Sequence, residues 1–173
     1  MRLMHPPIDS KLPRVGTTIF TVMSRLAAEH GAINLSQGFP DFDPPDLLLD
    51  LASHHMRKGG AGNQYAPMAG LPSLRHAIAA KVSEYYGCMV DPENEITVTS
   101  GGTEALFCAI QAIVRAGDEV ILFDPAYDSY EPAVELAGGR AVHVPLQRPG
   151  FGIDWQRLGD AITPRTRLLV INF

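Results

Sequence analysis

Cysteine is scarce in this sequence, which has only Cys88 and Cys108. Two cysteines are too few for a disulfide scaffold, and this pair is too widely spaced for a Cys-x-x-Cys redox motif. A small secreted domain stapled by disulfides is therefore excluded. We expect both thiols to be free and buried, in a protein that works in the reducing cytoplasm.

Basic clusters and long hydrophobic runs are also missing. The formal net charge is −5, and no patch of Lys and Arg is present to neutralise a phosphate backbone, so nucleic acid is not expected as a partner. No stretch reaches the length needed to span a membrane. The segment 1–11 lacks the apolar core of a signal peptide, and no metal site is predicted.

What the sequence does contain is the alternation of helix and strand patterns that is typical of an α/β fold. Its 46% hydrophobic and 19% charged residues are those of a globular protein with a sizeable core. The run 120–123 is apolar on both faces, as in a parallel strand covered by helices on each side. Periodicity predicts helices at 18–30, 44–57, 72–86, 103–115, 129–137 and 154–161. It predicts strands at 95–99, 119–124, 141–144 and 167–173, with a short strand entering a loop at 33–42.

The segment 99–107 joins a strand pattern to the start of a helix and carries the adjacent glycines Gly101 and Gly102. Glycines let the backbone approach an anion closely, and the first amides of a helix lack intrahelical acceptors. The hydroxyl of Thr103 adds a further donor. The segment therefore predicts a phosphate site, although an ordinary strand-to-helix turn favours the same residue types.

Tyr127 follows the next predicted strand, in the stretch Asp124-Pro125-Ala126-Tyr127. Ligands of open α/β sheets bind beyond the carboxyl ends of the strands, where an aromatic ring could stack on a planar ligand. A tyrosine packed at a strand end is the alternative. A dinucleotide site fits less well, because the residues after Gly101 lack the Gly-x-Gly-x-x-Gly spacing and Glu104 would face the pyrophosphate.

Four stretches in this order resemble the class I and II aminotransferases of fold type I, which depend on pyridoxal 5'-phosphate, and in particular their methionine and kynurenine aminotransferase branch. The stretches are 34–42, 63–67, 97–107 and 117–130. The resemblance runs from about Lys11 to the end of the sequence. It implies the large domain of that fold, a mostly parallel sheet flanked by helices, of which this chain would hold only part.

The resemblance also implies the roles of individual residues. The amides of Gly101, Gly102 and Thr103 would hold the cofactor phosphate, and Tyr127 would stack on the pyridine ring. Tyr65 would reach the phosphate of a neighbouring subunit, which implies a homodimer. Two further residues, Gly38 and Phe20, would line the substrate site.

No catalytic residue is assigned, because none of the three lysines matches the position of the family's catalytic lysine. The lysines are Lys11, Lys58 and Lys81. The sequence also stops inside a predicted central strand, at Phe173, without a following crossover. We therefore expect an amino-terminal piece that is inactive alone, with an arm and the start of the small domain at 1–44 and the first part of the large domain at 45–173.

The implied activity of the parent protein is transfer of an amino group from an amino acid, methionine or an aromatic one, to a 2-oxo acid. Cleavage of C–S bonds by a β-lyase on the same scaffold is an open alternative, because both reactions use the residues present here. A non-catalytic binding or dimerisation module is a third.

Overall fold

The computed structural model describes residues 9–38 and 40–172. The chain forms two compact units: one joins the residues up to Ile19 to the segment from Ser100 onward, and the other spans Phe20–Thr99. Each unit is described by itself below. The predicted division into 1–44 and 45–173 stays a prediction.

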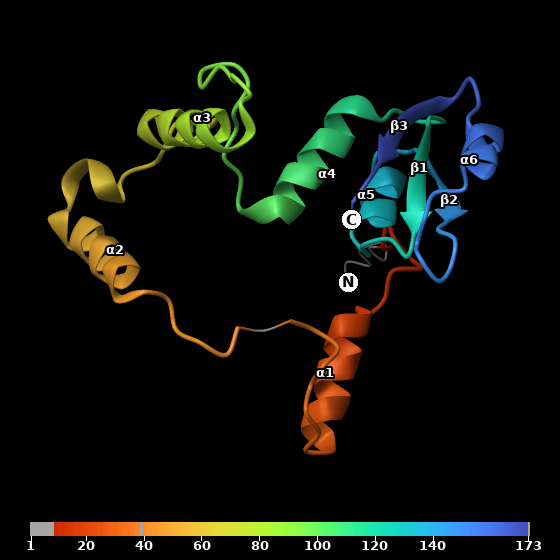
Figure 1. Ribbon diagram of the computed structural model, residues 1–173, viewed down its shortest axis with the longest axis horizontal. Coiled ribbons are helices and arrows are strands. Elements are labelled where there is room, and N and C mark those ends of the chain that lie inside the picture. Colours follow the sequence, from red (N-terminus) through yellow and green to blue (C-terminus); the bar gives the residue numbers. More distant parts are fainter. Residues whose placement is uncertain (1–8, 39, 173) are drawn as a thin grey trace, which may run out of the picture. The chain divides into compact units, whose positions relative to one another are not determined.

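The first unit is built on a three-stranded parallel sheet with the order β2-β1-β3 (Figure 1). This confirms the predicted α/β class. The strands are β1 Glu119–Asp124, β2 Arg140–Pro145 and β3 Thr166–Val170. The helices are α4 Gly101–Ile113, α5 Tyr130–Leu136 and α6 Trp155–Ala161. Phe173, at the end of the last predicted strand, lies outside the described residues.

The central strand β1 is buried on both faces, as its apolar run predicts. Val120 and Leu122 face α4 and α5, whereas Ile121 and Phe123 face the side that α6 covers through Leu158. Successive side chains of a strand point to opposite faces, so a continuous apolar run requires cover on both. The sheet therefore lies between two helical layers.

A buried carboxylate ties the amino-terminal end of the sheet together. Glu119, only 1% exposed, accepts hydrogen bonds from Arg140 Nη2 at 2.8 Å, Thr163 Oγ1 at 2.7 Å and Arg165 Nε at 2.9 Å. The hydrogen bonds from Arg140, Thr163 and Arg165 lower the pKa of Glu119 from 4.5 to about 2. The cluster thus links β1 to β2 and to the turn before β3.

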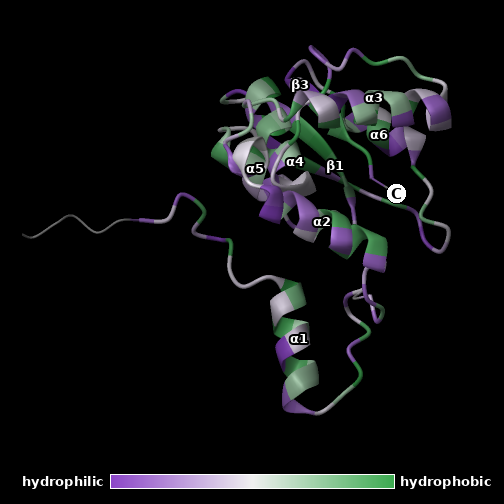
Figure 2. Ribbon diagram, turned by 90° about the vertical axis from the view of Figure 1, so that its left-hand side faces the viewer, coloured by the Kyte–Doolittle hydropathy of each residue, from purple (hydrophilic) through white to green (hydrophobic). Residues whose placement is uncertain are grey.

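The second unit contains α1 Ile19–Glu29, which begins at the unit boundary, then α2 Asp46–Lys58, the 3₁₀ helix η1 Gly60–Asn63 and α3 Pro72–Tyr86. Pro72 stands at the start of α3, and Gly87 ends it in the left-handed conformation at φ +62°, as Gly and Pro at these positions predict. Polar and apolar residues alternate along α1 (Figure 2), which fits its predicted amphipathic pattern.

Two predicted strands are wrong. Segment 95–99 forms no ladder in the described structure, and the amide of Val98 donates to the carbonyl of Ala69 at 3.0 Å. Segment 33–42 is irregular in its described residues, while Phe39 lies outside them.

The prediction of free thiols is confirmed for Cys88 and Cys108, but both are exposed rather than buried. Among the described helices, none combines the length and the apolar character that crossing a membrane requires.

Candidate functional site

Helix α4 begins at Gly101, directly after its N-cap residue. Its N-cap residue, Ser100, makes no side-chain capping bond, so its hydroxyl does not occupy an amide of the first turn. Gly101 adopts a φ of +84°, a conformation that residues with a Cβ rarely enter. Glu104 turns back to accept a hydrogen bond from the amide of Ser100. The Glu104 carboxylate is therefore engaged at the amide that precedes the glycines.

The space around the two glycines is also open. A Cβ built on Gly101 or Gly102 would have no described atom within 4 Å outside their own chain neighbourhood. Gly101, Gly102 and Thr103 are all exposed. The first amides of a helix lack intrahelical acceptors and carry partial positive charge, so this terminus has the chemistry of an anion site.

Tyr127 lies in the turn that connects β1 to α5. Tyr127 is 42% exposed, and its ring contacts the Tyr130 ring edge to face, with centroids 5.6 Å apart. The hydroxyl of Tyr130, itself 6% exposed, accepts a hydrogen bond from Asn172 Nδ2 at 3.0 Å. The Tyr127 ring therefore packs against a buried tyrosine, and Asn172, after β3, hydrogen-bonds that tyrosine.

A small cavity lies at the same place. Its volume is about 30 Å³, and its lining comes from the ends of β1 and β3, the residues that follow them and the start of α5. Tyr127, Tyr130 and Asn172 are part of that lining. In Figure 1, α4 begins to the left of the sheet and rises toward it, in the direction opposite to that of β1. Tyr127 and this cavity therefore lie at the carboxyl end of the sheet, where α/β folds bind ligands. The phosphate role of the glycine turn at the start of α4 stays a prediction.

Sequence reasoning missed the side chains that support this turn. His143 on β2 reaches Asp124 at 2.9 Å and Glu131 at 3.7 Å, one residue on each side of the turn. In the sequence, Asp124 stands out only as part of the stretch 117–130. Nothing local to residue 143 signals its contact with either carboxylate.

The other predicted site residues belong to the second unit. Tyr65 follows η1 and is fully exposed, at 101%. The loop before it is anchored by Asn63, whose Nδ2 donates to the carbonyl of Met56 at 2.8 Å. Gly38 is exposed and has no described atom near its virtual Cβ, and Phe20 is half-buried on α1. Their assigned roles stay predictions.

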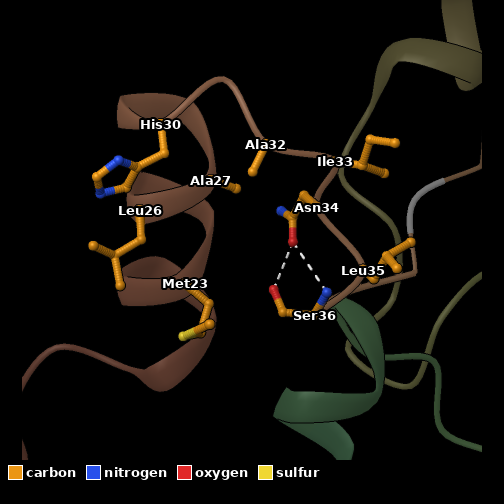
Figure 3. Close-up of a pocket in the computed structure, with 9 residues that line it drawn as sticks. All are labelled: Met23, Leu26, Ala27, His30, Ala32, Ile33, Asn34, Leu35 and Ser36. Carbon is orange, nitrogen blue, oxygen red and sulfur yellow. Dashed lines mark hydrogen bonds between the residues drawn. The ribbon is translucent and has the colours of Figure 1, made fainter.

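The motif around Asn34 has a structural role in this unit. Asn34 Oδ1 accepts hydrogen bonds from the amide and the hydroxyl of Ser36, at 3.1 and 2.6 Å (Figure 3). The Nδ2 of Asn34 donates to Ser24 Oγ at 3.1 Å. These bonds hold the loop after α1 against that helix and frame a cavity of about 370 Å³. Neither Gly38 nor Phe20 is among the residues that line it.

The residues present fit a phosphorylated aromatic cofactor. The open glycine turn suits the phosphate, and the exposed face of Tyr127 suits a planar ring. No described group of three or more His, Cys, Asp and Glu side chains could hold a metal ion.

Comparison with known proteins supports this interpretation. A sequence model of the family "Aminotransferase class I and II" matches residues 30–172. The methionine aminotransferase of Escherichia coli (strain K12) is 56% identical over 164 residues, covering 95% of this chain. Kynurenine-oxoglutarate transaminase 1 of Homo sapiens is 42% identical over 159 residues, covering 86% of this chain. This chain spans 42% and 38% of the length of these two relatives, respectively.

The solved structures agree. A structure from Escherichia coli, described as identifying a methionine aminotransferase function, matches with a TM-score of 0.89 at 56% identity. The match covers 95% of this chain and 43% of that one. The predicted resemblance and fold type are thereby confirmed, and the chain belongs to the aminotransferase class I and II family.

Proposed function

We propose that the protein that carries this chain is an aminotransferase that binds pyridoxal 5'-phosphate and moves an amino group from an amino acid to a 2-oxo acid. Methionine or an aromatic amino acid is the proposed donor. The observation that carries the proposal is the start of α4, where no side chain of the N-cap residue caps the helix and a Cβ on Gly101 or Gly102 would meet no described atom, in a member of this family.

The residues of this chain would bind and orient the cofactor. The amides of Gly101, Gly102 and Thr103 and the Thr103 hydroxyl would hold the phosphate. No described atom lies within 4 Å of a Cβ built on either glycine, and these amides lie at the positive end of α4. Tyr127 would set the plane of the ring through its exposed face. When bound, the cofactor supplies an electron sink for the charge left when a substrate loses its Cα proton.

We assign no proton transfer to this chain. Moving the Cα proton needs a lysine amine in this family, and Lys11, Lys58 and Lys81 do not stand at the matching position. The contribution of these residues is therefore anchorage and orientation. Gly38 and Phe20 are proposed to contact the substrate.

We further propose that the protein is a homodimer in which Tyr65 contributes to the partner's phosphate site. Tyr65 is fully exposed on a loop that Asn63 anchors, so it is available to a second copy. The two free thiols fit a cytoplasmic location.

The test uses the whole protein supplied with pyridoxal 5'-phosphate. We expect a visible absorbance band that borohydride abolishes, and conversion of a 2-oxo acid to its amino acid when methionine is present. The Gly102→Asp variant should lose the band, whereas His54→Leu, on an exposed face of α2, should keep it. Release of pyruvate and ammonia from cystathionine without an added oxo acid would instead identify a β-lyase, and no band in the wild type would refute the cofactor site.

A further inference from the structure

We propose that His143 is a positioning residue for the Tyr127 ring. This inference rests on the proposed function, because it gives the turn around Tyr127 a role in holding the cofactor. His143 is not one of the residues proposed to touch the cofactor. It acts through the two carboxylates that flank the turn.

The first step of the argument is the geometry of the turn. Asp124 ends β1 and Glu131 lies in the first turn of α5, so the six residues between them, Tyr127 included, form a loop with two fixed ends. His143 Nδ1 lies 2.9 Å from Asp124 Oδ1, and His143 Nε2 lies 3.7 Å from Glu131 Oε2. One imidazole thus hydrogen-bonds the carboxylate at the start of the loop and lies close to the carboxylate at its end.

The second step concerns the proton on the ring. An ionised carboxylate only accepts hydrogen bonds, so His143 must carry a proton on Nδ1 to bond Asp124. The backbone supports the same end, because the amide of Leu146 donates to the Asp124 carbonyl at 2.9 Å. Strand β2 therefore holds Asp124 by its main chain and by its side chain together.

The third step is the exposure of these groups. The side chains of His143 and Asp124 are each 37% exposed, and exposed ion pairs add little to global stability. The Tyr127 ring lies between the two flanking carboxylates in the chain and contacts the ring of Tyr130, the first residue of α5. A restraint on the ends of the turn acts on the placement of that ring far more than on the folded state as a whole.

The choice of substitution makes the test sharp. Asparagine places an amide N–H where histidine has Nδ1, whereas glutamine mimics Nε2. His143→Asn should therefore keep the bond to Asp124, His143→Gln should lose it in part, and His143→Leu should lose both contacts. His54→Leu is the matched control, since His54 is an exposed histidine outside this unit.

The first measurement is the affinity of the whole protein for pyridoxal 5'-phosphate. We expect His143→Leu to weaken binding about fivefold, the effect of losing one partly exposed charge-assisted hydrogen bond. His143→Asn and His54→Leu should stay within about twofold of the wild type, as expected where that bond is kept or untouched. In a Tyr127→Ala background, His143→Leu should have no further effect, because a residue that acts through Tyr127 is silent without it.

The second measurement needs no cofactor. The amide of Tyr130 donates to the Tyr127 carbonyl at 3.2 Å, and its hydrogen exchange should be faster in His143→Leu while the melting temperature changes little. Unchanged exchange, or an affinity loss of the same size in the Tyr127→Ala background, would overturn the proposal. A wild type that does not bind pyridoxal 5'-phosphate would refute the proposed function, and the exchange rate would then decide alone whether His143 orders the turn.

Discussion

Replacing the two adjacent glycines one at a time separates the folding role of this turn from its binding role. Gly101 has a φ of +84°, whereas Gly102 is helical and outside the left-handed region, and a Cβ meets no described atom within 4 Å at either position. The two alanine variants therefore differ in backbone conformation and not in steric clash.

The magnitudes follow from that difference. Forcing a residue with a Cβ into the left-handed region costs about 1–2 kcal/mol. Alanine in place of glycine at a helical position gains about 0.5–1 kcal/mol. The free energy of unfolding of Gly102→Ala should therefore exceed that of Gly101→Ala by about 1.5–3 kcal/mol, measured by urea denaturation of the protein without cofactor.

Binding should follow a different order. Gly102→Asp adds a carboxylate where the phosphate is proposed to lie, and two unit charges about 4 Å apart near a surface repel by about 4 kcal/mol. We expect a loss of cofactor affinity of about a hundredfold or more in this variant, with a near-normal urea midpoint. Equal stabilities for the two alanine variants would refute the assigned start of α4, and an unchanged affinity of Gly102→Asp would refute the phosphate site.

Three further perturbations test other parts of the structure. Because the pKa of Glu119 falls from 4.5 to about 2, its stabilising contribution is complete above pH 4.5 and is lost as the pH falls toward 2. Glu119→Gln should be less stable at pH 7 and should show a flatter loss of stability between pH 5 and 2 in acid titrations, and an equally steep loss would contradict the cluster. Gly139→Ala places a Cβ 2.6 Å from Val114 Cγ1, so thermal or urea unfolding should show a loss of about 1–3 kcal/mol. Tyr127→Ala should shift the absorbance band of the cofactor or weaken cofactor binding, whereas Tyr127→Phe should preserve both. If neither variant changes the band or the affinity, Tyr127 has only a packing role.

The core of the first unit was predictable because its signal is local. The run from Val120 to Phe123 is apolar at every position, and the observed strand β1 is buried on both faces. The paired glycines likewise mark the start of α4, although the helix begins at Gly101, two residues before the predicted position. Such features depend on neighbours in sequence.

The incorrect strand at 95–99 shows where that reasoning stops. Ile96 and Val98 alternate with polar residues as in a strand. This alternation indicates which side chains are buried, but it does not show whether a second strand is available for pairing. The structure gives Val98 one backbone bond, to Ala69, rather than a ladder. Pairing is a long-range property that this pattern does not encode.

The supporting side chains of the candidate site were unpredictable for a related reason. Tyr130 meets Asn172 across 42 positions, and Asp124 meets His143 across 19. The second contact needs the parallel register in which Leu122 pairs with His143, and this register becomes visible only in the assembled sheet. Sequence reasoning could therefore propose residues for ligand contact, but not the side chains that support them.

The two ends of the sheet satisfy their polar groups in opposite ways. At the amino end, Glu119 is buried and fully engaged by two arginines and a threonine. At the carboxyl end, the Tyr127 ring is partly exposed, and the first turn of α4, in the same unit, has no side-chain cap. A turn left without a cap gives up about 1 kcal/mol that a capping side chain would supply. An anion bound at this turn would supply part of that stabilisation, so a bound phosphate should raise the stability of α4 and leave the Glu119 cluster unchanged.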